Sequence, residues 1–257
     1  MLSQLNILKN NINNHILIIM PTYNRPNNIE NSIQMILNQI FTNWIFLIID
    51  DGSSEINKII FRNIKEKYSD INNIIFWENE TNCNIPKTLN RGIDYLLNTT
   101  NNFTHFTWIS DDNEYYPNFL AILVDQNIFF KYSSYRIKNN TPKQYTHKNK
   151  YFSYSHILHS WNGCASFMWT KKAIQQIGFY SEFLQGCEDY EYLIRTFKLN
   201  YDECKHSLIP LVTYVIHSDA LSERTKPHVF KLNKLISQYY SNNTNDYSLE
   251  QYIALNS

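Results

Sequence analysis

Glycine is scarce in this chain, and the glycine-rich loops that bind nucleotides in several enzyme classes are missing. Only 5 of the 257 residues are Gly and 7 are Pro. That composition argues against a long disordered linker. The sequence contains no Gly-x-Gly-x-x-Gly fingerprint and no Walker loop. Neither dinucleotide binding nor P-loop phosphate binding is therefore indicated.

An excess of charge of either sign is also missing. The 23 basic residues balance 23 acidic ones, for a formal net charge of +0. Nucleic acids and anionic membranes attract proteins through a broad basic surface. We therefore expect no nucleic-acid partner, and any binding must depend on local groups.

Long apolar runs and closely paired cysteines are absent too. The first apolar run, Ile16–Met20, is too short for the core of a signal peptide, and no run approaches the length that spans a bilayer. The four cysteines are widely spaced, without a Cys-x-x-Cys pair, which argues against a zinc or redox site. We expect a protein of a reduced compartment, the cytoplasm, with no membrane span.

Short apolar runs alternate with amphipathic segments in the first half of the chain. Buried strands are expected at 15–20, 45–49, 74–77 and 106–109, and helices at about 27–40, 55–68 and 85–96. Asn27 is expected to cap the first helix, with Glu30 completing a capping box. The alternation predicts the α/β class, with a single Rossmann-like, mostly parallel sheet flanked by helices.

The second half of the chain is less regular. We expect helices at 117–126, 170–176 and from 186 onward, strands at 128–135, 165–169 and 208–216, and a mobile polar loop at 136–150. Thr170 is expected to cap its helix. With 43% hydrophobic residues, the chain suffices for one domain over 1–257. Within this domain we expect a first half at about 16–125, a second half at about 126–225 and a C-terminal helical extension at 226–257.

Polar side chains stand where the predicted strands end. In strand order they are Tyr23, then Asp50 and Asp51, then 79–84, then Asp111 and Asp112. Right-handed crossovers bring such ends to one edge of the sheet, where ligands bind in open α/β folds. Adjacent carboxylates such as Asp111 and Asp112 repel each other unless a cation or a donor-rich ligand shares them. Mg²⁺ and Mn²⁺ take carboxylate oxygens together with substrate phosphates. The alternative is an acidic turn, with Asp chosen for turn geometry.

Several short motifs follow one another along the chain. They are Pro-Thr-Tyr-Asn-Arg at 21–25, Asp-Asp-Gly-Ser at 50–53, Asn-Arg-Gly-Ile at 90–93, Gly-Phe-Tyr at 178–180, Glu-Asp at 188–189 with Arg195, and a late segment with His217, Leu221 and Ser222. In order and spacing they resemble glycosyltransferase family 2 over about 16–224. The resemblance implies a GT-A fold and inverting sugar transfer. The Gln-x-x-Arg-Trp motif of processive members is missing, which favours transfer of a single sugar.

The resemblance also implies roles for single residues on the donor side. It predicts a nucleotide site made of Pro21, Tyr23, Asp50, Asp51, Asn84 and Asp111. Tyr23 would stack on the base, and Asp51, in preference to Asp50, would accept hydrogen bonds from it. Asp112 would hold Mn²⁺ or Mg²⁺ against the diphosphate, and Asp111 would face the ribose or share the metal. His217 would be a further metal ligand or a donor to the diphosphate, although a lone His at a strand end is often structural.

On the acceptor side, Asp189 is the expected general base, with Glu188 beside it. An inverting enzyme needs one carboxylate to take the proton of the acceptor hydroxyl. The alternative is that both are charges favoured at a helix N-terminus. Trp161 and Asn162 are expected near the acceptor.

Two positions depart from the family pattern. Ser110 stands in place of the first carboxylate of the Asp-x-Asp motif, and Asn84 stands where Gly is usual. They motivate a second hypothesis, a non-catalytic module that binds nucleotide-sugars or glycans on the same scaffold. A sugar nucleotidyltransferase would need a Gly-rich, basic loop, and 21–26 contains no Gly. The leading hypothesis is metal-assisted transfer of one sugar from a uridine diphosphate (UDP) donor to a hydroxyl of a glycan or other acceptor.

Overall fold

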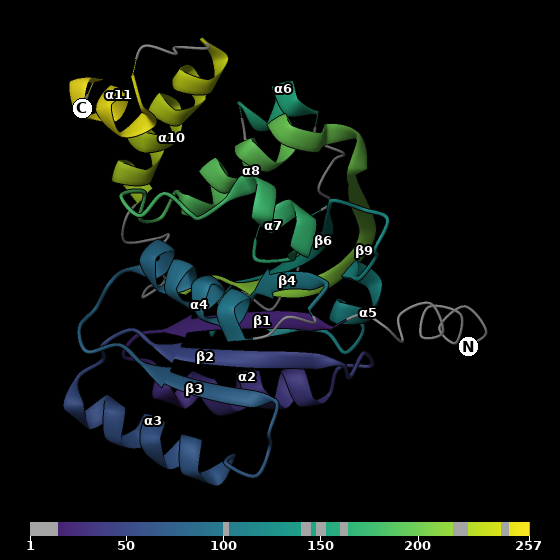
Figure 1. The fold of residues 1–257 in the computed structure, drawn as a ribbon, viewed down its shortest axis with the longest axis vertical. Helices are drawn as coiled ribbons and strands as arrows, with labels where there is room; N and C mark the ends of the chain where they lie inside the picture. Colours follow the sequence, from purple (N-terminus) through teal and green to yellow (C-terminus); the bar gives the residue numbers. More distant parts are fainter. Residues whose placement is uncertain are drawn as a thin grey trace.

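The computed structural model describes residues 15–99, 103–139, 145–147, 153–159, 164–217, 226–242 and 247–256. Within these ranges nine strands form one mixed sheet, in the order β3-β2-β1-β4-β8-β6-β9-β5, with β7 beside β6. Figure 1 shows β3, β2, β1 and β4 next to one another in this sheet. The strands are β1 (Ile16–Thr22), β2 (Trp44–Asp50), β3 (Ile74–Glu78), β4 (His105–Trp108), β5 (Glu114–Tyr115), β6 (Phe130–Lys138), β7 (Tyr145–His147), β8 (Phe167–Thr170) and β9 (Cys204–Val215). The predicted acceptor-side residues 161 and 162, and the family-motif residues 221 and 222, lie outside the described ranges.

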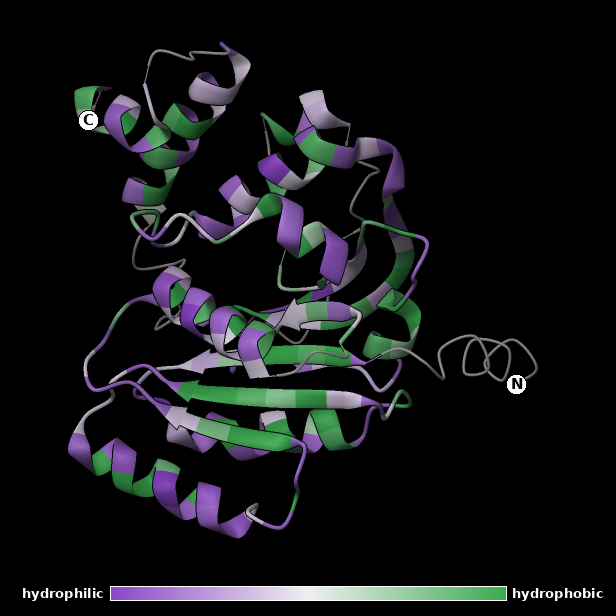
Figure 2. Ribbon diagram, viewed as in Figure 1, coloured by the Kyte–Doolittle hydropathy of each residue, from purple (hydrophilic) through white to green (hydrophobic). Residues whose placement is uncertain are grey.

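The first four strands form the parallel part of the sheet. β1 pairs in parallel with β2 and β4, and β2 pairs in parallel with β3. The register sets Thr22 beside Asp50 and Asp50 beside Glu78, so these strands end at one edge. The parallel sheet predicted for the first half is confirmed. β1 and β2, in the middle of this part, are largely green and so apolar in Figure 2, as is typical of strands buried on both faces.

Helices cover both faces of this parallel part. α2 (Pro26–Leu37) and α3 (Glu55–Lys67) contact each other, and α4 (Ile85–Thr99) contacts β1 and β2. Successive residues of a strand point to opposite faces of the sheet. Accordingly Leu17 belongs to the core cluster that α4 joins, whereas Ile18 belongs to the cluster that α2 and α3 join. The sheet is therefore enclosed in a two-sided apolar core.

The start of α2 differs from its prediction. Arg25 takes the N-cap position and Pro26 follows at the start of the helix, without a side-chain cap. Proline suits this position because its fixed φ matches the helix and its missing N–H is not needed there. Asn27 lies inside the helix, and Glu30 pairs with Lys67 of α3 at 2.5 Å. The predicted Asn27 cap is therefore wrong.

Antiparallel strands extend the sheet beyond β4. β8 pairs antiparallel with β4 and β6, while β9 pairs parallel with β6 and antiparallel with β5. The stretch at 136–150, predicted as a loop, is partly strand, because β6 continues to Lys138 and pairs with β7. A strand at the edge of a sheet can consist of polar residues, because strands pair through backbone hydrogen bonds. Composition alone therefore gave the wrong structure for this stretch.

Three helices of the second half begin within two residues of their predicted positions, namely α5 (Phe119–Leu123), α7 (Lys171–Ile177) and α8 (Glu188–Asn200). The sequence did not predict α6 (Tyr154–Ile157) or the short η1 (Tyr201–Glu203). The hydroxyl of Thr170 accepts a hydrogen bond from the N–H of Ala173 at 3.3 Å, which confirms the predicted cap of α7. The helix expected at 117–126 is shorter than predicted.

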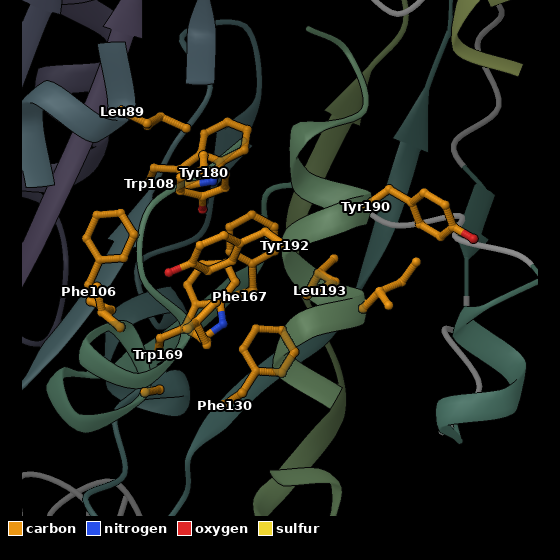
Figure 3. Close-up of a cluster of buried hydrophobic side chains, with 14 of the residues drawn as sticks. Leu89, Phe106, Trp108, Phe130, Phe167, Trp169, Tyr180, Tyr190, Tyr192 and Leu193 are labelled. Carbon is orange, nitrogen blue, oxygen red and sulfur yellow. The ribbon is translucent and has the colours of Figure 1, made fainter. Parts of the chain in front are cut away.

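An aromatic cluster joins the sheet to α8 (Figure 3). The ring of Trp169 in β8 lies 5.0 Å from that of Phe130 and 4.7 Å from that of Phe167. Tyr192 of α8 meets Trp169 edge-on at 5.3 Å. Truncation of a buried aromatic residue such as Trp169 to Ala typically costs about 3–5 kcal/mol. This packing fixes α8, and with it the acidic residues at its start.

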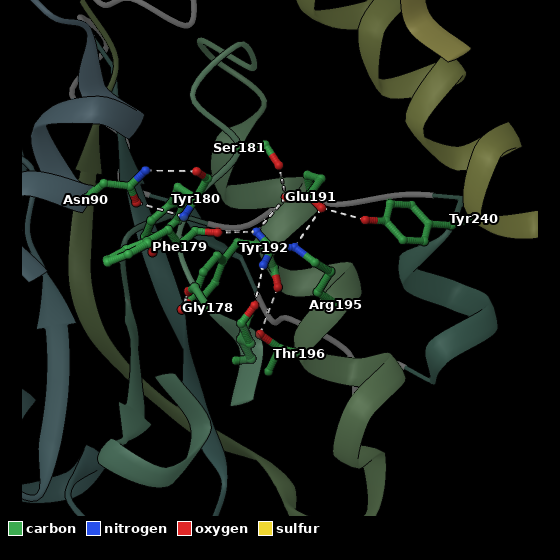
Figure 4. A network of polar contacts seen from close by, with 11 residues as sticks. Asn90, Gly178, Phe179, Tyr180, Ser181, Glu191, Tyr192, Arg195, Thr196 and Tyr240 are labelled. Carbon is green, nitrogen blue, oxygen red and sulfur yellow. Dashed lines mark hydrogen bonds and ion pairs between the residues drawn. The ribbon is translucent and has the colours of Figure 1, made fainter. Parts of the chain in front are cut away.

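Two helices close the chain, as the sequence predicts. α10 (Lys226–Ser241) and α11 (Leu249–Asn256) pack together. Tyr240 of α10 donates a hydrogen bond to Glu191 of α8 at 2.5 Å, and Arg195 donates to the same carboxylate at 2.7 Å (Figure 4). Glu191 is buried, so these partners offset the cost of burying its charge. In the described ranges, no helix has the length and apolarity needed to cross a bilayer.

Candidate functional site

Two cavities meet at the edge where β1, β2 and β4 end. The first, of about 160 Å³, is lined by Pro21, Thr22, Tyr23, Arg25, Asp51, Asn82, Asn84, Ile85, Trp108, Ser110, Asp111, Asp112 and Gln185. The second, of about 630 Å³, is lined by Arg25, Asn28, Asn31, Met35, Asp111, Asp112, Asn113, Glu114, Val215 and His217. The cavities share Arg25, Asp111 and Asp112. The fold thus gathers most of the predicted donor-side residues around one space.

Asp51 holds the loop that follows β3. Its Oδ1 accepts hydrogen bonds from Thr88 Oγ1 at 2.6 Å, Asn79 Nδ2 at 2.8 Å and the backbone N–H of Cys83 at 2.9 Å. The residue is 4% exposed, yet it lines the first cavity. Asn79 belongs to the polar stretch 79–84 noted in the sequence, whereas the contact of Thr88 could not be predicted, because nothing in a helix residue indicates a distant carboxylate.

Asp50 is not among the described residues that line either cavity. Its carboxylate accepts hydrogen bonds from the hydroxyl of Ser53 and from the backbone N–H of Ser53, the latter at 3.1 Å. Burial raises the pKa of Asp50, and the bonds from Ser53 oppose that rise. In this structure Asp50 shapes the turn after β2, and its predicted contact with the nucleotide has no support from the geometry.

Two asparagines adopt the left-handed backbone conformation beside the first cavity. Asn84 has φ 71° and Asn24 has φ 55°. Glycine adopts such angles at no steric cost, and asparagine tolerates them. This explains why Asn84 can stand where the family usually has Gly. Asn24 also ties two turns together, because its N–H donates to Ser53 Oγ at 2.7 Å and its Oδ1 accepts from the N–H of Ser54 at 2.9 Å.

Arg25 bridges the two adjacent carboxylates. Its Nη1 lies 2.6 Å from Asp112 Oδ2 and 3.5 Å from Asp111 Oδ1. Thr22 Oγ1 donates a hydrogen bond to Asp111 Oδ2 at 2.7 Å. Burial raises the pKa of Asp111 to about 6, with Asp112 adding to the rise and Thr22 and Arg25 opposing it. The sequence indicated that a cation would share these carboxylates but did not identify Arg25 as one.

Within the described ranges, Asp112 has three side-chain partners, one of which is Arg25. Its Oδ2 also lies 3.0 Å from His217 Nε2, and the hydroxyl of Ser110 donates to its Oδ1. Burial alone would raise the pKa of Asp112, but the hydrogen bonds from Ser110, His217 and Arg25 outweigh it and lower the pKa. Ser110, the departure from the Asp-x-Asp pattern, therefore supports Asp112 directly.

The donor set around Asp112 is compatible with a divalent cation. Among the described residues, no three His, Cys, Asp or Glu side chains gather as a metal site. Mg²⁺, however, is usually held by one or two protein carboxylates, substrate phosphates and water. Asp112 and His217 offer one carboxylate and one imidazole at a single point, with Asp111 adjacent. These residues suit a cation that a substrate diphosphate helps to hold.

Residues 17–178, more than half of the chain, match the family model of Glycosyl transferase family 2. The chain belongs to glycosyltransferase family 2. It is 25% identical, over 75% of its length, to an uncharacterized glycosyltransferase of Rickettsia prowazekii, and it covers 61% of that protein. An uncharacterized glycosyltransferase of Rickettsia felis is 24% identical over 86% of this chain, which covers 37% of that relative. The chain therefore spans less than two thirds of the length of these relatives.

Solved structures share the fold of this family 2 chain. S. aureus TarS in complex with UDP-GlcNAc has a TM-score of 0.67 at 14% identity, covering 93% of this chain and 69% of that one. The Pyrobaculum calidifontis mannosyltransferase PcManGT, in complex with GDP-Man and Mn²⁺, has a TM-score of 0.64 at 13% identity, covering 90% of this chain and 65% of that one. The expected GT-A fold is confirmed.

The family's acidic pair lies at the start of α8. Glu188 is 4% exposed, and its Oε2 accepts a hydrogen bond from the N–H of Gly186 at 2.5 Å. Burial, with the neighbouring Asp189, raises the pKa of Glu188 to about 8. Asp189 is half-buried, and its Oδ1 accepts from the N–H of Tyr190 at 2.7 Å. Neither acid is among the described lining residues, although Gln185 in the same segment lines the first cavity.

Proposed function

We propose that this protein is an inverting glycosyltransferase that moves one sugar from a UDP-sugar to an acceptor hydroxyl. The observation that carries the proposal is the first cavity, in which Tyr23, Asp51 and Asp112 from the ends of three parallel strands line one space. An open α/β sheet binds its ligand at this edge. Membership of glycosyltransferase family 2 supports sugar transfer as the reaction class. The uridine donor, the metal and the general base are inferred in addition.

The chain offers distinct groups for each part of the donor. Tyr23 is 47% exposed and lines the cavity, so its ring is available to stack on a base. Asp51 and Pro21 line the same space and would contact the nucleotide, together with Asn84 and Asp111. The complex of TarS with UDP-GlcNAc supports a uridine donor. The complex of PcManGT with GDP-Man makes a guanosine donor the alternative to be tested.

Asp112 and His217 are the residues that would hold Mn²⁺ or Mg²⁺. A bound divalent cation supplies positive charge that stabilises the departing diphosphate. The protein's own part is to keep Asp112 ionised, which the hydrogen bonds from Ser110 and His217 favour. The Mn²⁺ in the PcManGT complex supports this choice of cofactor.

Asp189 is the proposed general base. The acceptor oxygen attacks the anomeric carbon while the bond from that carbon to the diphosphate oxygen breaks, and the acceptor proton passes to Asp189. Glu188 suits this role less, because it is more deeply buried than Asp189 and its carboxylate is held by the N–H of Gly186. The fixed position of α8 against the sheet would hold Asp189 in place.

A panel of nucleoside-diphosphate sugars, with and without Mn²⁺, tests the proposal. A donor present at 100 times its Kd should stabilise the protein by about 2.7 kcal/mol in thermal unfolding. Any stabilising donor is then incubated with acceptors while released nucleotide is measured. Lack of stabilisation by every donor would reject the proposal. Stabilisation without nucleotide release would instead favour the second candidate, a non-catalytic nucleotide-sugar or glycan-binding module, which Ser110 motivates.

A further inference from the structure

The side chain of Arg25, the N-cap residue of α2, does not cap its own helix. Its side chain reaches across to a segment 87 residues away and ends between Asp111 and Asp112. The guanidinium lines both cavities, so it stands where the two spaces meet. Only 23% of the Arg25 side chain is exposed. The contact of Arg25 with the two carboxylates is therefore partly buried and belongs to the site, unlike an exposed ion pair at the surface.

A divalent cation and Arg25 would compete for the same oxygen. Arg25 Nη1 lies 2.6 Å from Asp112 Oδ2, and His217 Nε2 lies 3.0 Å from that atom. Mg²⁺ binds oxygen at about 2.0–2.1 Å, so an ion on Asp112 Oδ2 would lie inside the present contact of Nη1. Two cations at that separation repel strongly in a partly buried site. An ion bound to Asp112 Oδ2 would therefore require Arg25 to leave that oxygen.

The surroundings offer Arg25 a second partner. The first cavity, in which the donor nucleotide is proposed to bind, begins directly beside the guanidinium. A diphosphate there would bring several negative oxygens close to Arg25. The planar guanidinium forms paired, charge-assisted hydrogen bonds with phosphate oxygens as readily as with carboxylates. Its charge would then stay neutralised after it leaves the carboxylates.

We propose that Arg25 is the resident cation of this acidic site: it holds Asp111 and Asp112 in the ligand-free protein and moves to the donor diphosphate when a divalent cation replaces it. The inference rests on the metal and donor sites of the proposed function. Its consequence is coupling, because the metal ion displaces Arg25 more easily when a diphosphate is present to accept it. Metal and nucleoside diphosphate should therefore bind far better together than separately.

Calorimetry on Arg25→Gln, which keeps most of the side chain and removes the charge, tests the competition. Titrations use Mn²⁺ alone and UDP in saturating Mn²⁺. Arg25→Gln should bind Mn²⁺ alone at least about tenfold more tightly than the wild type, because nothing displaces it from Asp112, and UDP about tenfold more weakly. Arg62→Gln is the matched control, since Arg62 forms an exposed ion pair with Glu78 away from the cavities, and should change neither affinity.

Three outcomes would overturn the proposal. Folded Arg25→Gln that binds no Mn²⁺, or binds it no more tightly than the wild type, would show that Arg25 does not compete with the ion. Tighter Mn²⁺ binding with unchanged UDP affinity would overturn the transfer of Arg25 to the diphosphate. None of these titrations needs sugar transfer, so a protein that binds Mn²⁺ as expected but transfers no sugar would refute only the proposed function.

Discussion

His217 Nε2 lies 3.0 Å from Asp112 Oδ2, although 105 residues separate the two in the chain. If this pair holds the cation, Asp112→Ala should abolish the Mn²⁺-dependent part of UDP binding. His217→Ala should weaken it by at least about 10–100-fold, which is already the usual cost of losing a residue that only supports a metal ligand. Calorimetry with and without Mn²⁺ measures both. His228→Ala, an exposed histidine of α10, is the control and should have no effect. Unchanged Mn²⁺ dependence in folded Asp112→Ala would contradict the assignment.

Tyr23 should contribute to nucleotide affinity without contributing to stability. Its ring is 47% exposed at the mouth of the first cavity. Stacking of a base on an aromatic ring is worth about 1–3 kcal/mol, so Tyr23→Ala should weaken UDP binding about 5- to 150-fold and leave the melting temperature nearly unchanged. Tyr247→Ala, at a similarly exposed tyrosine, should leave UDP affinity unchanged. A wild type that binds GDP as tightly as UDP would show that the predicted uridine preference is wrong.

Gly52 and Gly178 have similar backbone conformations but different surroundings, so alanine substitutions at the two positions can be compared directly. Both have positive φ, 72° and 81°, so alanine strains the backbone at either position. A Cβ on Gly52 would lie 2.7 Å from Thr81 Cα and closer still to Thr81 C and Asn82 N, whereas a Cβ on Gly178 meets nothing within 4 Å. Gly52→Ala should therefore displace the loop that lines the first cavity and greatly weaken UDP binding. Gly178→Ala should cost about 1–3 kcal/mol of unfolding free energy and leave UDP affinity intact.

The clustering of the donor-side residues could be predicted from sequence, because it follows from strand direction. Continuous apolar runs such as Ile16–Met20 mark buried parallel strands, and parallel strands end at one edge. Tyr23, Asp51 and Asp112 therefore had to gather once the strands were recognised. The start of α8 was equally visible, because Gly186 and the acids after it form a typical helix beginning.

The contacts between side chains could not be predicted in the same way. In the sequence, Arg25 stands out only as part of a motif that resembles the family's turn. Its contact with Asp112 depends on how the loop after β1 is placed relative to the loop after β4, which the sequence pattern does not specify. The pairing of β6 with β7 could not be predicted, because a backbone ladder does not need apolar residues and the stretch 136–150 is polar in sequence. Asp50 and Asp51 are neighbours of the same chemistry, and only the fold determines that Asp50 bonds to Ser53 while Asp51 lines the cavity.

Asp111 should make stability depend on pH. Its pKa is raised from 3.8 to about 6, so the folded state keeps a proton that the unfolded state releases between those values. Stability therefore falls as pH rises through that window, by up to about 3 kcal/mol. Denaturant unfolding of the wild type should show this loss relative to Asp111→Asn between pH 4 and 6. Asp70→Asn, at an exposed position, should follow the wild type throughout. Parallel curves for the wild type and Asp111→Asn would disprove the raised pKa.

Asp189 separates an enzyme from a binding module. The residue begins α8, whose packing through Tyr192 on Trp169 fixes its place. Asp189→Asn keeps the shape and an oxygen for the N–H of Tyr190, and it removes the proton acceptor. General-base catalysis contributes about 10²–10⁴-fold, so the transfer rate should fall by that factor, or about 3–5 kcal/mol of transition-state stabilisation. UDP-sugar affinity should be nearly unchanged, because the proposed donor contacts lie on Tyr23 and Asp112.

Glu188→Gln is the matched control for this experiment. Burial and the neighbouring Asp189 raise the pKa of Glu188, which leaves less of it ionised to accept a proton, and glutamine keeps both its shape and an oxygen for the N–H of Gly186. Its transfer rate should fall far less than that of Asp189→Asn. Transfer at the wild-type rate by Asp189→Asn would mean that Asp189 is only a charge at a helix N-terminus. A large loss in Glu188→Gln alone would assign the base to Glu188, and loss in neither variant would direct the search to His217.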